Sequence, residues 1–161
     1  MFTISIVNDN IEDMPEGGIF EIEIITFKGK SLATQVYTSF PSLPRLNNTI
    51  FNVSFENRFL IQRTDCYVRA RFIPANSASS DDYYYNYYFY NNPIEMNLPR
   101  PEISLIVEED NTLTLSTKAF AMYVYIYVCA NADATLRLSE NYFHLSPGWP
   151  VKVEVLSNHL L

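Results

Sequence analysis

Apolar and polar residues alternate with a period of two along most of this chain, a pattern typical of β-strands. No window carries the three- and four-residue spacing of an amphipathic helix. In residues 18–27, three apolar side chains on one face of a strand alternate with two glutamates on the other. These are Phe20, Ile22 and Ile24 against Glu21 and Glu23. In the first 98 residues, strands are predicted at 2–7, 18–27, 31–40, 50–61, 65–74 and 83–98.

Prolines, glycines and polar clusters divide these strands. A turn is predicted at 27–30, and Pro41 and Pro44 exclude a central strand from their segment because proline lacks a backbone donor. The run Leu98-Pro99-Arg100-Pro101 is the best candidate for a linker, since two prolines one residue apart stiffen a connection and end a strand. Beyond it, strands are predicted at 102–109, 112–117, 122–129, 135–138 and 151–155.

The spacing of strands and turns predicts an all-β chain of two tandem antiparallel β-sandwiches. We place the first at residues 1–98 and the second, smaller one at residues 99–161. The second is near the lower size limit for an independent core, so it is expected to depend on the first.

Residues 139–155, SENYFHLSPGWPVKVEV, form the most distinctive segment. Pro147-Gly148 suits the central pair of a type II turn, because proline fixes φ and glycine accepts a positive φ. After the turn, three valines are expected to face inward while Lys152 and Glu154 face water. The segment therefore predicts a hairpin-like return at the end of a sandwich.

Composition narrows the function without specifying it. Apolar residues make up 48% of the 161 residues, which predicts a packed core, and the net charge of −7 argues against nucleic acid and anionic membrane surfaces. The longest apolar run, 120–130, is too short to span a bilayer as a helix. Acidic clusters at 9–16 and 108–110 lack the alternation of a calcium loop. Because a strand begins at once without a leader, we expect that a preceding part of the protein has been removed.

Few residues suited to catalysis or metal binding occur. Cys66 and Cys129 lie in apolar, strand-like runs, where unpaired buried thiols are the favoured interpretation and a disulfide is the alternative. His144 and His159 have no partners at the spacing of a zinc site or a catalytic triad. We therefore predict no catalytic residue, no metal site and no cofactor.

The run Ser139–Gly148 resembles a segment in the last immunoglobulin-like domain of family 2 glycoside hydrolases of the β-mannosidase type. That segment reads as a polar pair, Asn-Tyr-Phe, an apolar residue and Pro-Gly, followed by a valine-rich strand. The order upstream is also similar: an aromatic strand (YYYNYYFY), the Leu98–Pro101 joint and an Ile-rich strand, with ISIVNDN at the start. The resemblance covers nearly the whole chain, but only the two C-terminal accessory domains of such an enzyme.

The resemblance implies two immunoglobulin-like sandwiches whose parent hydrolyses terminal β-D-mannosides with retention, using two glutamates of a (β/α)8 barrel. This chain has no βαβ pattern, and its pair Glu56-Asn57 is in the reverse order of the family's Asn-Glu pair, so no catalytic residue is carried over. The chain alone is expected to be inert and to scaffold the barrel and the other sandwich domains. It would meet carbohydrate only through the parent, which the family places in a lysosome or outside the cell.

An alternative interpretation starts from the aromatic run Tyr83–Tyr90, because aromatic faces stack on sugar rings. The favoured interpretation is structural, with one face of this strand in the core and the other against a neighbouring domain. The alternative function is a free-standing immunoglobulin-like module that binds carbohydrate or protein. Trp149 is expected to cap the sandwich or contact the barrel. Asn47 and Asn52 begin sequons and are glycosylation candidates if the chain enters a secretory compartment.

Overall fold

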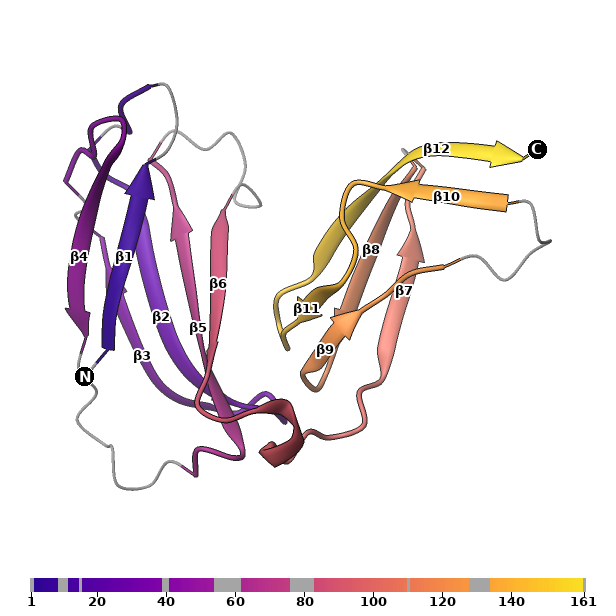
Figure 1. Ribbon diagram of the computed structural model, residues 1–161, viewed down its shortest axis with the longest axis horizontal. Helices are drawn as coiled ribbons and strands as arrows, with labels where there is room; N and C mark the ends of the chain where they lie inside the picture. The colour runs from indigo at the N-terminus through magenta and orange to yellow at the C-terminus, as the bar shows by residue number, and fades with distance from the viewer. Residues whose placement is uncertain are drawn as a thin grey trace. The chain divides into compact units, whose positions relative to one another are not determined.

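The computed structural model describes residues 2–8, 12–14, 16–38, 41–53, 62–75, 83–109, 111–127 and 134–160. The described chain is almost entirely antiparallel β-structure, so the predicted fold class is confirmed. It divides into two compact units (Figure 1). Unit 1 comprises Met1–Thr26 and Ser31–Met96, and unit 2 comprises Phe27–Lys30 and Asn97–Leu161. The boundary between residues 98 and 99 stays a prediction.

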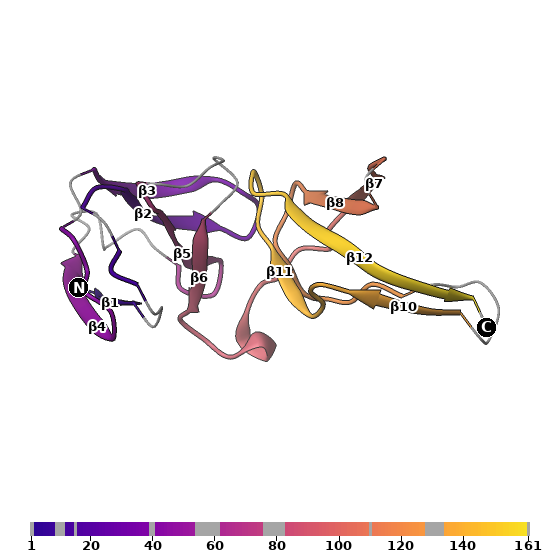
Figure 2. The same cartoon turned by 90° about the horizontal axis from the view of Figure 1, so that it is seen from above.

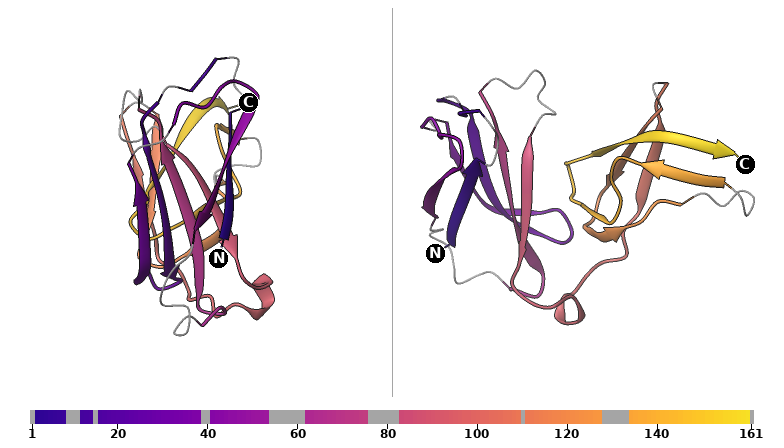
Figure 3. Two further views of the ribbon diagram at one scale, coloured as in Figure 1. Left: turned by 90° about the vertical axis from the view of Figure 1, so that its left-hand side faces the viewer. Right: turned by 45° about the horizontal axis from the view of Figure 1, so that its top comes forward.

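Unit 1 contains a four-stranded sheet of order β3-β2-β5-β6 and a two-stranded sheet, β1-β4, which form separate layers (Figure 2, Figure 3). All neighbouring strands are antiparallel. The elements are β1 (Phe2–Asn8), β2 (Ile19–Thr26), β3 (Ser31–Tyr37), β4 (Asn47–Val53), β5 (Cys66–Ile73), β6 (Tyr84–Phe89) and the 3-10 helix η2 (Pro93–Glu95).

The core of unit 1 lies between these two layers. Phe20, Ile22 and Ile24 are buried on the inner face of β2, as their alternation predicts. They pack with Val68 and Phe72 of β5, while isoleucines of β1 cover them from the other sheet. The inner face of the larger sheet is therefore the main hydrophobic surface of this unit.

Unit 2 contains a four-stranded sheet of order β10-β12-β8-β7 and a two-stranded sheet, β11-β9. Strands β10 and β12 run side by side up to the C-terminal end (Figure 2). The elements are β7 (Ile103–Val107), β8 (Thr112–Thr117), β9 (Ala121–Val124), β10 (Ala134–Leu138), β11 (Phe143–Leu145) and β12 (Val151–Leu160).

The distinctive segment 139–155 forms the predicted turn and strand. Gly148 has φ +77°, and the Trp149 N–H donates to the Ser146 carbonyl at 3.1 Å. Val151 and Val153 are buried in the core of unit 2, whereas the charged residues between and after them are exposed. Both the turn and the inward valines are thus confirmed.

Several strands are shorter than the pattern predicts, and two of them differ most. The aromatic strand ends at Phe89 rather than continuing to 98, because Pro93 begins a 3-10 turn. The strand predicted at 122–129 becomes β9, which ends at Val124. Tyr123 has φ +54°, outside the β region, and this conformation disrupts the regular ladder. The predicted strand at 50–61 lies outside the described residues beyond Val53.

Candidate interaction face on the aromatic strand

Strand β6 divides its aromatic residues between the two faces of the four-stranded sheet. Tyr85 and Tyr87 lie directly opposite Arg71 and Arg69 of β5, on the outward face. Because side chains alternate along a strand, Phe89 shares this face. The outward face therefore combines aromatic rings with cationic side chains.

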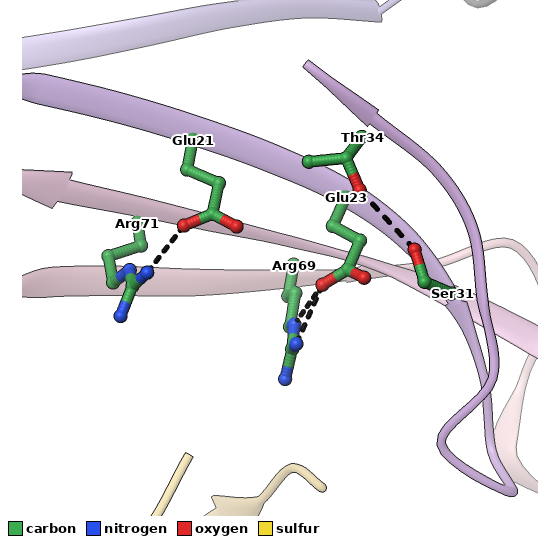
Figure 4. A network of polar contacts seen from close by, with 6 residues as sticks. All are labelled: Glu21, Glu23, Ser31, Thr34, Arg69 and Arg71. Atoms are coloured by element: carbon green, nitrogen blue, oxygen red, sulfur yellow. Dashed lines mark hydrogen bonds and ion pairs between the residues drawn. The ribbon is translucent and has the colours of Figure 1, made fainter. Parts of the chain in front are cut away.

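Two cross-strand ion pairs occupy the same face (Figure 4). The β2–β5 register places Glu23 opposite Arg69 and Glu21 opposite Arg71. The Arg69 Nε donates to Glu23 Oε2 at 2.7 Å, and its Nη2 lies 2.6 Å from the same oxygen. The Arg71 Nη2 is 2.5 Å from Glu21 Oε2. The first pair is the deeper one, since its side chains are 9% and 8% exposed against 26% and 20% in the second.

These pairs are not predicted above, although the sequence contains a signal for them. Glu21 and Glu23 are spaced by two, and so are Arg69 and Arg71 on the adjacent strand. Opposite charges at matching positions of neighbouring antiparallel strands stabilise the sheet when the register aligns them. The glutamates were expected on the polar face, and that is where they lie. Their burial depends on the register, which single-strand patterns do not give.

The outward aromatic rings contact one another. The Tyr87 ring centroid lies 5.6 Å from that of Tyr85 and 6.0 Å from that of Tyr67. Phe89 stacks on Tyr87 at 6.5 Å with an interplanar angle of 20°. Burial, and then the neighbouring Tyr67, raise the pKa of Tyr87 above its ordinary value, so its hydroxyl stays neutral. These rings contact largely one another, which fits the structural interpretation of this face.

The other face of β6 lies on the core side of the sheet, yet its tyrosines are exposed. Tyr84 and Tyr88 are 62% and 54% exposed, and Asn86 between them is also exposed. The reason is that, within the described residues, the opposite sheet has two strands, too few to cover the edge strand β6. Tyr84 and Tyr88 are thus the aromatic side chains of β6 that are accessible to a ligand.

The two glycosylation candidates lie on the same strand, β4. Asn47 and Asn52, at the two ends of β4, are both exposed. The Asn47 Oδ1 accepts from the Asn48 N–H at 2.8 Å, and the Thr3 hydroxyl donates to Asn52 Oδ1 at 3.2 Å. Exposure makes both amides accessible, and their modification stays a prediction.

The remaining sequence candidates are structural where they are described. Cys66 is free and buried, and burial, then the charge of Asp65, raises its pKa to about 11. Trp149 is buried, and His144 Nδ1 accepts from the Tyr123 N–H at 3.2 Å. Cys129 lies outside the described residues, and nothing is described of the His159 side chain.

Within the described ranges, no three His, Cys, Asp or Glu residues gather in an arrangement that holds a metal ion. The same part of the chain contains no helix of sufficient length and apolarity to cross a membrane.

The class that the fold defines is the immunoglobulin-like β-sandwich. Residues 98–160 match the Ig_mannosidase family, described as an Ig-fold domain. The resemblance to an immunoglobulin-like domain of the mannosidase type is thereby confirmed for residues 98–160. No match to a curated protein sequence is found.

Solved structures extend the fold similarity to nearly the whole chain. The exo-chitosanase CsxA of Amycolatopsis orientalis superposes with a TM-score of 0.59 at 11% identity, over 94% of this chain and 22% of that chain. A complex of a variant of that enzyme with PNP-beta-D-glucosamine gives a TM-score of 0.58 at 10% identity, with the same coverage. The chain thus spans about a fifth of the length of these structures.

Proposed function

We propose that this chain is the non-catalytic accessory portion of a β-mannosidase-like glycoside hydrolase. Its two units would scaffold a catalytic barrel supplied by the rest of the parent protein, which would hydrolyse terminal β-D-mannosides with retention. The observation that carries the proposal is the Ig_mannosidase match over residues 98–160. The chain alone would be inactive, because retaining hydrolysis needs two carboxyl groups about 5 Å apart at a sugar-binding cleft.

The ion pairs on the outward face of unit 1 support a scaffolding role. Glu23 and Arg69 are both less than a tenth exposed. We infer that this buried, matched pair contributes more to the register of β2 and β5 than to their net stability. A domain that must present fixed surfaces to a catalytic neighbour benefits from such a register.

The test is an immunoblot of the source organism with an antibody against this chain. We expect a band several times heavier than the 18.6 kDa of the chain. Hydrolysis of a β-mannoside and of a β-glucosaminide by the immunoprecipitate would then assign the substrate. A heavy band that hydrolyses only the glucosaminide would retain the accessory role and reject the mannosidase assignment. A single band near the mass of the chain, without glycosidase activity, would reject both.

The exposure of Tyr84 and Tyr88 favours one second candidate, a free-standing module that binds sugars through this aromatic pair. A glycan array probed with the 161-residue chain tests it. Binding that is lost in both Tyr84→Ala and Tyr88→Ala, but kept in the outward-face variant Tyr85→Ala, would support the module. Absence of binding by the folded chain would reject it.

A further inference from the structure

Unit 1 has an open side between the edge strands of its two sheets. Strand β1 belongs to a sheet of two strands, whereas the facing sheet has four. In a sandwich, each inner face is buried by the strands of the opposite sheet. A layer of two strands leaves part of a layer of four uncovered, and the exposure of Tyr84 and Tyr88 on β6 shows where.

A pocket of about 260 Å³ lies at this open side and is built mainly from apolar side chains. Ile4 and Ile6 line it from β1, and Phe20 and Phe72 line it from the facing sheet. Tyr84 of β6 adds an aromatic wall. The pocket therefore has the character of an incompletely covered core rather than of a polar catalytic cleft.

The backbone of β1 offers hydrogen-bonding groups along this side. Residues Phe2–Asn8 pair with β4 on one edge. Within the described part of the chain, no strand pairs with the other edge. An unpaired strand edge presents a row of N–H and C=O groups that accept an added strand. The edge and the pocket lie together, so one ligand satisfies both.

We propose that this open side is a strand-acceptor site for one extended polypeptide segment. The segment would pair antiparallel with β1 and direct alternate apolar side chains toward Phe72 and Tyr84. An immunoglobulin sandwich has at least seven strands, and six are described in unit 1. A third strand beside β1 would lie opposite the exposed face of β6 that carries Tyr84 and Tyr88.

The occupant we infer is polypeptide that precedes β1 in the parent enzyme, joined to it by a tight turn. A short hairpin connection makes the two strands antiparallel. The CsxA chain, of which only 22% is covered, extends far beyond the matched part. The origin of the occupant rests on the proposed function, whereas the acceptor site itself does not.

The test is an N-terminal extension of the full chain. The extension Val-Thr-Val-Thr-Val-Thr-Asn-Gly, placed before Met1, supplies an alternating strand and a hairpin turn that sets its valines opposite Phe2, Ile4 and Ile6. Its control carries proline in place of two threonines and so lacks two ladder donors. We expect the valine extension to protect every second amide of β1 from hydrogen exchange at least tenfold more than the control does. Oxidative footprinting of Tyr84 and Tyr88 should fall in parallel.

A second pair of variants links the protection to the pocket. In the extended chain, Ile4→Lys places a charge in the pocket and should abolish the gain in protection. Thr3→Lys, on the exposed outer face of β1 and outside the pocket lining, should keep most of it. Amide protection in the central strands β2 and β5 of unit 1 reports in each case whether this unit has folded.

Three outcomes would overturn the acceptor site. The first is equal hydrogen exchange of the β1 amides in the valine and proline extensions. The second is an unextended monomer that already protects both sets of β1 amides. The third is an unextended chain that forms a dimer and protects β1 in that way. None of these readouts involves glycosidase activity. Failure of the mannosidase assignment would therefore leave them unchanged, and their failure would leave the immunoblot unchanged.

Discussion

Glu23 and Arg69 show how one residue pair can matter more than its place on an outward face suggests. Their side chains are 8% and 9% exposed. Glu23→Gln removes the negative charge but keeps the shape of the side chain. Because a buried guanidinium then loses its carboxylate, we expect the free energy of unfolding to fall by about 3 kcal/mol. Urea denaturation followed by circular dichroism measures this change.

The matched control is the neighbouring pair, Glu21 with Arg71. It has the same chemistry on the same two strands but is 20% and 26% exposed. Solvent screens a more exposed pair, so Glu21→Gln should cost only about 1 kcal/mol or less. Equal losses for the two variants would contradict the view that burial decides the difference.

His144 provides a pH-dependent residue in unit 2. Burial lowers its pKa below the ordinary value, and its Nδ1 accepts from the Tyr123 N–H. The unfolded chain therefore binds a proton more readily than the folded chain. Above the pKa of about 6.5 that His144 has in the unfolded chain, its contribution to the free energy of unfolding does not change with pH. As the pH falls below this value, the free energy of unfolding decreases.

His144→Phe keeps a ring beside Phe120 and Tyr123 but cannot ionise. The difference in unfolding free energy between the native protein and this variant should be constant from pH 8 to about pH 7. Below that, the native protein should lose up to about 1.4 kcal/mol per pH unit relative to the variant. Chemical denaturation across this pH range tests it. Parallel curves for the two proteins would show that His144 titrates normally.

At the scale of an element, the Asn141 side chain replaces a missing strand partner. Its Oδ1 accepts from the Ile126 N–H at 2.9 Å, and its Nδ2 donates to the Ile126 carbonyl at 3.1 Å. Asn141→Ala removes both bonds, so we expect a loss of about 2 kcal/mol in the free energy of unfolding. Asn141→Ser, whose shorter side chain does not span both groups, should cost a similar amount. Hydrogen exchange at the Ile126 amide checks the assignment, since it should accelerate in both variants.

Two turn glycines of unit 2 differ in their surroundings rather than in their backbone. Gly29 and Gly148 have φ of +84° and +77°, both unfavourable for other residues. A Cβ on Gly29 would lie 3.0 Å from the Pro147 Cβ and 3.2 Å from the Lys118 carbonyl, whereas one on Gly148 meets nothing within 4 Å. Gly148→Ala should therefore cost about 1 kcal/mol for its conformation alone. Gly29→Ala should lower the free energy of unfolding by at least about 1 kcal/mol more than Gly148→Ala does, because of the clash. Equal melting temperatures for the two variants would contradict the clash.

At the scale of the whole molecule, the strand pattern predicts most of the fold. Alternation places the inward residues of β2 and β12 correctly, and Pro147-Gly148 predicts its turn. Strand ends are less accurate where backbone conformation departs from the pattern, as at Tyr123. Local sequence does not encode such departures, because they depend on contacts made across the sheet.

For the candidate site on β6, the sequence predicts even less than it does for the strand ends. The aromatic run is evident in the sequence, but which of its faces is accessible is not. Tyr84 and Tyr88 lie on the core side of the sheet, and they are exposed because the facing sheet has two strands within the described residues. The number of strands in the opposite layer is a property of the assembled sandwich. No pattern within β6 contains it.

Strand β7 is a second apolar surface that the isolated chain leaves open. It forms one edge of the larger sheet of unit 2, and all five of its residues are exposed. Ile106 and Val107 are 56% and 69% exposed. Exposed apolar edge strands pair with other chains, and lysine at such an edge prevents this pairing. We therefore expect the isolated chain to self-associate as its concentration rises.

Ile106→Lys should lower this self-association with little change in melting temperature, as measured by light scattering coupled to size-exclusion chromatography. The matched control is Leu46→Lys, which makes the same change of charge at an exposed residue outside the strands. Because the two variants have equal net charge, a reduction seen only for Ile106→Lys would assign the association to the β7 edge. A reduction of the same size in both would assign it to charge repulsion instead, and β7 would then carry no special role in the isolated chain.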